Sequence, residues 1–267
     1  MQDMIPFLNL KLPFGRPSSR RFLPEPFTWI SIPAGQVTLI ENSDEESYLG
    51  KKGSTHVFDV PAFAIAKYPV TNGQFAVFLK AEGYNQRQWW TEEGWQVKET
   101  QNWITPFYWK NAAWNKPNYP VVGVSWFEAV AFCLWLRNVT DEAIALPTEQ
   151  QWQRAAQGNS NRAYPWGDQF DAKRCNFYQE GTESVTQFSG KGDSPFGVSD
   201  MSGNVNEWCL TDYKNGTQNI ASTTKVRALR GGTWAAFPDS DYLRVDRRDG
   251  DNPTARMPAI GFRLSRS

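Results

Sequence analysis

The side chains that most often bind metals or act as nucleophiles are scarce in this chain. It contains one histidine, His56, and three cysteines, Cys133, Cys175 and Cys209. A single imidazole cannot build a multi-histidine zinc site, a two-histidine iron site or a protease helix that needs two histidines. It could serve a Ser-His-Asp mechanism, but the chain has no G-x-S-x-G motif, so we interpret His56 as a strand residue.

The three cysteines predict no chemistry of their own. They are far apart in the sequence, odd in number and set among apolar or aromatic residues, which is typical of reduced, buried thiols. The chain also lacks G-x-x-x-x-G-K-[ST] and any G-x-G-x-x-G that opens a helix. We therefore expect neither a thiol-based site nor a phosphate-binding loop of these types.

The composition predicts how the chain would hold a site in place. It has 267 residues, 40% of them apolar, with 13 Trp, 17 Phe and 9 Tyr, so loops can be fixed by aromatic burial. Lys and Arg (28) balance Asp and Glu (28), and no apolar run approaches the roughly 20 residues of a membrane helix. We expect a cytoplasmic protein with no membrane span and no nucleic-acid partner; the sequence does not predict its oligomeric state.

Three helix starts share the capping box, in which a Ser or Thr caps the helix and a Glu or Gln three residues later reaches back to it. The pairs are Thr71 with Gln74, Ser125 with Glu128, and Thr148 with Gln151. Between the first two starts, residues 83–120 carry six tryptophans with little periodicity. We interpret that tract as ordered loop.

Alternating apolar residues predict strands at 27–32 and 37–40, joined as a hairpin, and at 57–60 and 63–68, with core strands at 226–234 and 260–264. Five prolines and three arginines in residues 1–26 indicate an N-terminal arm. We therefore predict one α+β domain over residues 27–267, loop-rich, with antiparallel sheets and two to three short helices.

Eight sequence runs resemble the formylglycine-generating enzyme (sulfatase-modifying factor) family, in that family's order. The runs are IPAG (32–35), KYPVTN (67–72), PVVGVSW (120–126), LPTE (146–149), YPWG (164–167), DMSGNV (200–205), RGGTW (230–234) and IGFR (260–263). The resemblance implies a variant of the C-type lectin fold. It does not fix the chemistry, because function belongs to the site and not to the fold.

The resemblance also implies where a metal would be bound in the family's enzymes. Two cysteines a few residues beyond the Gly-Gly turn bind copper there, but Ala236 and Asp241 stand about where those thiols would be. Neither a methyl group nor a hard carboxylate replaces a thiolate that selects Cu(I). Iron-dependent relatives take histidine ligands from a separate helical domain. We therefore expect no copper, and predict that the chain is not an enzyme.

One structural metal is compatible with the resemblance. Family members hold calcium around a stretch that matches Asp200, the carbonyls of Gly203 and Val205, and Glu207. Hard oxygen ligands at such spacing suit Ca²⁺. The alternative is that Asp200 and Glu207 only fasten a turn. The sequence is therefore compatible both with a structural calcium ion and with a turn that holds no metal.

Residues 233–263 differ in composition from the rest of the chain. They hold five Asp and five Arg but no Lys, Glu or Gln. Randomising the two adenines of Asn codons would produce this bias. The pattern resembles the variable protein of a diversity-generating retroelement, which presents hypervariable side chains on a lectin-like scaffold. The predicted ligand-binding residues are Ala235, Ala236, Phe237, Asp239, Ser240, Asp241, Tyr242, Asp246, Arg248, Asp249, Gly250 and Asp251.

Three functions follow from these patterns. The first is a ligand-binding protein that displays a hypervariable C-terminal surface to a protein or other macromolecule. The second is an oxidoreductase of the formylglycine-generating type with altered metal ligands. The third is a scaffold that recruits a partner through the aromatic tract from Trp89 to Trp114.

Overall fold

The computed structural model describes residues 17–41, 47–223, 225–236 and 239–267. Its α-helices are α1 (Ser19–Phe22), α2 (Asn72–Lys80), α3 (Glu92–Thr100), α4 (Trp126–Thr140) and α5 (Glu149–Gln157), and its 3-10 helices are η1 (Gly83–Asn85), η2 (Arg87–Trp89) and η3 (Ser240–Leu243). Its strands are β1 (Trp29–Ile32), β2 (Gly35–Ile40), β3 (Thr55–Val60), β4 (Phe63–Ala66), β5 (Ile144–Ala145), β6 (Asn206–Asp212), β7 (Arg227–Arg230), β8 (Asp249–Asp251), β9 (Ile260–Gly261) and β10 (Ser265–Arg266). The described residues thus form a mixed α+β domain, with five α-helices rather than two or three.

The strands form two four-stranded sheets and one two-stranded ribbon. Their orders are β1-β4-β10-β5, β8-β7-β6-β9 and β2-β3. Within the described residues the strand pairs are antiparallel except β6 with β9, which is parallel. The predicted hairpin between residues 27–32 and 37–40 is wrong, because β1 pairs with β4 and β2 pairs with β3. Alternation of apolar residues identifies a strand but not its partner.

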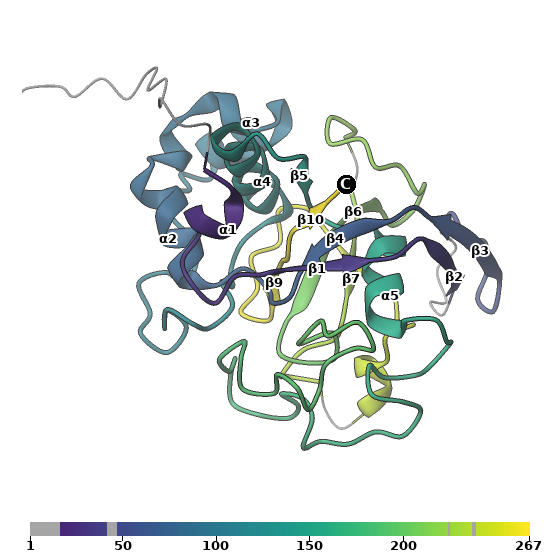
Figure 1. Ribbon diagram of the computed structural model, residues 1–267. Coiled ribbons are helices and arrows are strands. Elements are labelled where there is room, and N and C mark those ends of the chain that lie inside the picture. The colour runs from purple at the N-terminus through teal and green to yellow at the C-terminus, as the bar shows by residue number, and fades with distance from the viewer. Residues whose placement is uncertain (1–16, 42–46, 224, 237–238) are drawn as a thin grey trace, which may run out of the picture.

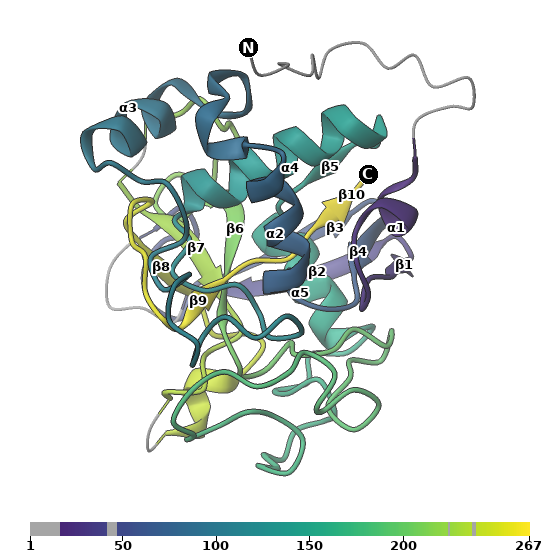
Figure 2. The same ribbon diagram turned by 90° about the vertical axis from the view of Figure 1, so that its left-hand side faces the viewer.

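The three predicted capping boxes are confirmed. In each one the Ser or Thr side chain accepts from the backbone N–H three residues on, and the Glu or Gln side chain accepts from the capping residue's own N–H. Figure 2 shows α2, α3 and α4 grouped at one end of the molecule, with the loop-rich part at the other end.

Aromatic rings fill the core around α4. Phe132 stacks on Phe75 with centroids 5.4 Å apart, and Trp135 lies 5.3 Å from Phe78. In the predicted N-terminal arm, Phe22 of α1 lies 5.6 Å from Trp135, so the described part of the arm packs on α4. A second core surrounds α5, the helix that lies beside β2 and β3 (Figure 1). Its Trp152 is fully buried.

None of the helices in the described part of the chain is long and apolar enough to cross a membrane.

Candidate functional site

A two-glycine turn brings the ends of β6 and β7 against the C-terminal segment. Gly231 and Gly232 follow β7 with φ of 103° and 70°. A Cβ on Gly232 would lie 2.4 Å from the carbonyl oxygen of Tyr242, so only glycine allows this approach. The Gly232 N–H donates to Oδ1 of Asn206 at 2.9 Å. The turn therefore joins β6, β7 and η3 at one point.

A pocket of about 260 Å³ lies at this junction. Its lining residues come from the start of β6, the two-glycine turn, η3 and β8: Asn206, Gly232, Thr233, Ala235, Ala236, Tyr242 and Asp249. We call this the C-terminal pocket. Its volume is near the lower end of the range for small-molecule sites, so it suits one side chain or a small group of a larger ligand.

Charged and aromatic groups meet at one wall of the C-terminal pocket. Tyr242 is 45% exposed, and the Arg247 guanidinium lies 4.7 Å from its ring centroid. Arg247 also pairs with Asp249, with Nη2 and Oδ1 3.3 Å apart. Burial raises the pKa of the Asp249 carboxyl, although Arg247 opposes this shift. The wall therefore offers an aromatic face, a cation and a carboxylate to a polar ligand.

An aromatic band runs from the two-glycine turn into the tryptophan-rich tract. Trp234 lies 5.6 Å from Trp114, which lies 5.8 Å from Tyr108, and Tyr108 lies 4.9 Å from Phe107. Residues 83–120 were predicted as loop, but they also contain α3 and the 3-10 helices η1 and η2. Neither the contact of Trp234 with Trp114 nor the position of Asn206 and Arg247 in the site was predicted from the sequence.

The structure assembles four of the twelve predicted ligand-binding residues in the C-terminal pocket: Ala235, Ala236, Tyr242 and Asp249. Another six are exposed or partly buried on the same segment: Asp239, Ser240, Asp241, Asp246, Gly250 and Asp251. Phe237 lies outside the described residues.

Arg248 is the exception, because it is a core residue with 1% of its surface exposed. Its Nε and Nη2 donate to the two carboxylate oxygens of Glu149, at 2.6 and 3.0 Å, and its Nη1 donates to Glu41 at 2.5 Å. Arg230 also pairs with Glu149, at 3.0 Å. Burial works to raise the pKa of Glu149, but Arg248 and Arg230 hold it below its ordinary value. The prediction that Arg248 contacts ligand is therefore wrong.

The predicted calcium ligands have other partners in the structure. The Glu207 carboxylate accepts from Nε and Nη2 of Arg263, at 2.5 and 2.6 Å, and from the Trp152 indole at 2.8 Å. Asp200 accepts from the Asn204 amide at 3.0 Å, and the Gly203 carbonyl accepts from the N–H of Val205 at 3.0 Å. Because Arg263 already neutralises Glu207, the four residues as they stand do not fit a calcium ion.

A melting experiment can test the calcium site that the sequence suggested. The contacts of Glu207 lead us to expect no stabilisation by calcium. We expect the melting temperature in about 1 mM calcium to equal that in about 1 mM EDTA within roughly 1 °C, since an ion at Glu207 would have to displace a buried guanidinium. Differential scanning calorimetry measures the difference. A rise of several degrees with calcium but not with magnesium would show that the ion is held after all.

The thiols of this chain do not fit a copper site either. Ala236 lines the C-terminal pocket and Asp241 lies exposed on η3. Neither side chain contains the sulfur that binds copper in the family's enzymes. All three cysteines are buried, Cys175 in the cluster against which Ala236 packs, and burial raises the pKa of Cys175 to about 12. A cysteine binds copper as its thiolate, which this shift disfavours. In the described ranges, no three His, Cys, Asp or Glu side chains come together as a metal site.

A scan against family models matches residues 17–267 to the sulfatase-modifying factor enzyme 1-like domain. Hercynine oxygenase of Mycobacterium tuberculosis is 30% identical over 263 residues, which is 85% of this chain and 57% of that protein. The chain thus spans little more than half of that relative. The inactive C-alpha-formylglycine-generating enzyme 2 of Bos taurus is 28% identical, covering 88% of this chain and 87% of its own length.

Among solved structures, variable protein 1 of Treponema denticola superposes with a TM-score of 0.61 at 21% identity, covering 90% of this chain and 95% of that one. At this identity the likeness shows the fold alone. Together with the family match, it confirms the predicted C-type lectin-like domain of the formylglycine-generating type.

The relatives contradict one prediction. The missing cysteine pair led us to expect that the chain is not an enzyme, but the similar mycobacterial proteins are named as oxygenases. The absence of the two cysteines argues only against a copper site of the family's type. It does not argue against an enzyme that uses other groups.

Proposed function

Because the chain belongs to the sulfatase-modifying factor enzyme 1-like family, we propose that it uses this scaffold to bind a protein or other macromolecular ligand through the C-terminal pocket and the exposed side chains of residues 235–251. One observation carries the proposal. The segment with the biased composition supplies most of the lining of a pocket that mixes aromatic, cationic and acidic groups.

The fold supports a surface whose side chains change while the backbone stays. Beneath the segment, Arg248 and Arg230 bind the buried Glu149, and Leu243 is fully buried between exposed neighbours. These inward contacts fix the backbone, so the outward residues carry little of the stability. Tyr242 would serve as the rigid aromatic anchor of the surface.

We also propose that a retroelement diversifies this segment. The neighbouring DNA tests it: a near-copy of the codons for residues 233–263, differing at adenines and close to a reverse transcriptase gene, should be found. A genome without such a copy would refute diversification while leaving ligand binding to be tested separately.

The exposed positions should tolerate substitution. Ala235→Ser and Asp241→Asn each change an exposed side chain, so we expect each to alter the free energy of unfolding by less than about 0.5 kcal/mol. Leu243→Ala, on the same segment but fully buried, should cost about 2–5 kcal/mol. Urea denaturation measures all three, and equal costs at exposed and buried positions would contradict a display surface.

An oxygenase activity is the second candidate function, favoured by the relatives' name. Oxygen uptake is the test, with hercynine or a cysteine-containing peptide as substrate and copper or iron supplied. Uptake above the protein-free background would favour this function over binding alone.

A further inference from the structure

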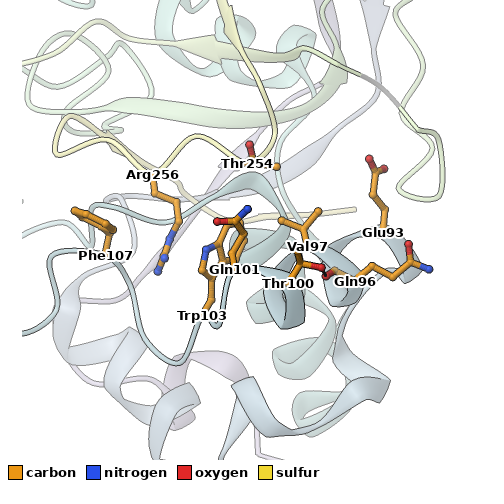
Figure 3. Close-up of a pocket in the computed structure, with 9 residues that line it drawn as sticks. All are labelled: Glu93, Gln96, Val97, Thr100, Gln101, Trp103, Phe107, Thr254 and Arg256. Atoms are coloured by element: carbon orange, nitrogen blue, oxygen red, sulfur yellow. Dashed lines mark hydrogen bonds between the residues drawn. The ribbon is translucent and has the colours of Figure 1, made fainter.

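A second groove, of about 770 Å³, lies between α3 and residues 254–256, and none of its lining residues belongs to the C-terminal pocket. Figure 3 shows α3 side chains along one side of it, with Arg256 and Phe107 on the other. We call it the α3 groove.

The floor of the α3 groove is fixed by Arg256. Its guanidinium lies 4.6 Å from the Trp103 ring centroid and 5.8 Å from that of Phe107. Its Nη2 donates to Oε1 of the buried Glu128 at 3.0 Å, and its Nε donates to the Gly123 carbonyl at 3.2 Å. Because Glu128 already neutralises the charge of Arg256, an anionic ligand would gain little from binding at the floor of the groove.

Exposed apolar side chains border the floor. Ile104, Phe107 and Met257 are 65%, 66% and 52% exposed. Gly123 places two of them side by side, because its carbonyl accepts from the N–H of Phe107 at 2.9 Å and its N–H donates to the Met257 carbonyl at 3.0 Å. These are three of the six large hydrophobic residues that are exposed in the described part of the chain. Their grouping indicates an interaction site rather than scattered surface residues.

The opposite wall is one face of α3 with its C-cap Gln101, and it is polar except for Val97. Glu93, Gln96, Val97, Thr100 and Gln101 line the groove at helical spacing. From Glu93 to Gln101 the helix rises about 12 Å, which matches three to four residues of an extended peptide. Side-chain amides at this spacing can pair with the N–H and C=O groups of such a peptide.

Glu93 is the acidic group of this wall. Within the described ranges it forms no salt bridge, whereas its neighbour Glu92 pairs with Arg87 and accepts from the Gln96 amide at 2.9 Å. It acts at a distance on Arg227, which lies beneath in the core. A cation entering the groove would therefore find a carboxylate without a bound partner.

We propose that the α3 groove binds an extended peptide segment of a partner protein, in which an apolar side chain and a lysine or arginine lie about three residues apart. The apolar side chain contacts Phe107 and Met257, the backbone pairs with the Gln96 and Gln101 amides, and the basic side chain pairs with Glu93. The proposal does not depend on a ligand at the C-terminal pocket.

Peptide pools test this proposal on the full chain. One pool of amidated heptapeptides has Leu and Lys fixed about three residues apart, in either order, and the other positions random. A second pool has Glu in place of Lys, and a third has Ser in place of Leu. Immobilised protein is incubated with an equal mixture, and the retained peptides are counted by mass spectrometry. We expect the first pool to be enriched at least tenfold over the other two.

Variants place the binding in the groove. Glu93→Lys should reverse the preference toward the Glu pool, whereas the matched change Glu99→Lys, at an exposed residue of the same helix outside the groove, should leave it unaltered. Phe107→Ser should abolish the preference for Leu, and Val57→Ser, at a residue that is 61% exposed on β3, should not. Equal retention of all pools, or the same preference in wild type and Glu93→Lys, would overturn the proposal.

Discussion

Replacing Arg248 with methionine will lower the free energy of unfolding by about 3–5 kcal/mol. The guanidinium donates to Glu149 through two nitrogens and to Glu41 through the third, and all three side chains are fully buried. Methionine fills much of the volume but removes the Arg248 cation from both Glu41 and Glu149, of which Glu149 keeps its pair with Arg230. An uncompensated buried carboxylate costs far more than the lost contact itself.

Arg247→Met is the matched control for that substitution. Arg247 is the preceding residue, but it is partly exposed and pairs with the partly exposed Asp249, so its loss should cost less than about 1 kcal/mol. Arg248→Lys keeps a charge but loses the two-nitrogen contact with Glu149, so it should fall between the two. Urea denaturation of the three variants measures the order. A cost for Arg248→Met no larger than that for Arg247→Met would contradict a buried role.

Arg247 and Arg248 also show the limit of reading a site from composition. Both belong to the segment with many Asp and Arg and no Lys, Glu or Gln, and the sequence alone gives them the same chemistry. In the structure one lies beside Tyr242 at the C-terminal pocket and the other lies in the core. The partners that draw Arg248 inward, Glu149 and Glu41, are 99 and 207 residues away, so no local pattern predicts the difference.

Local signals in the sequence predicted local structure well. The capping boxes at Thr71, Ser125 and Thr148 need only four consecutive residues each, and all three are confirmed. α3 was missed because its cap, Thr91, has Gly94 in place of Glu or Gln at the third helical position. The family's fold was likewise recognisable from its short runs, three of which contain the capping residues Thr71, Ser125 and Thr148.

Contacts between distant segments were not predictable in the same way. The pairing of β1 with β4, and of Arg263 with Glu207, depends on how whole elements pack. The calcium prediction rested on the resemblance of residues 200–207 to the family, and a guanidinium 56 residues from Glu207 occupies its carboxylate. The α3 groove arises similarly, since Glu93 and Arg256 line one groove only in the folded chain.

Gly232→Ala will destabilise the protein by about 2–5 kcal/mol and distort the C-terminal pocket. Two costs add. The residue has a φ of 70°, which an L-residue with a Cβ adopts at a cost, and that Cβ would meet the Tyr242 carbonyl at 2.4 Å and the Leu243 side chain at 2.7 Å. A backbone carbonyl cannot rotate away as a flexible side chain can, so η3 must move and carry Tyr242 with it.

Gly197→Ala separates the two costs. Gly197 has a similar φ of 87°, but nothing lies within 4 Å of the position of its Cβ, so alanine there should cost only the backbone strain, about 1–2 kcal/mol. Urea denaturation gives both values, and quenching of tyrosine and tryptophan fluorescence by acrylamide follows the displacement of Tyr242 and Trp234. Equal costs at Gly232 and Gly197 would mean that η3 is not held against the two-glycine turn, and the pocket would then lose the contact that shapes it.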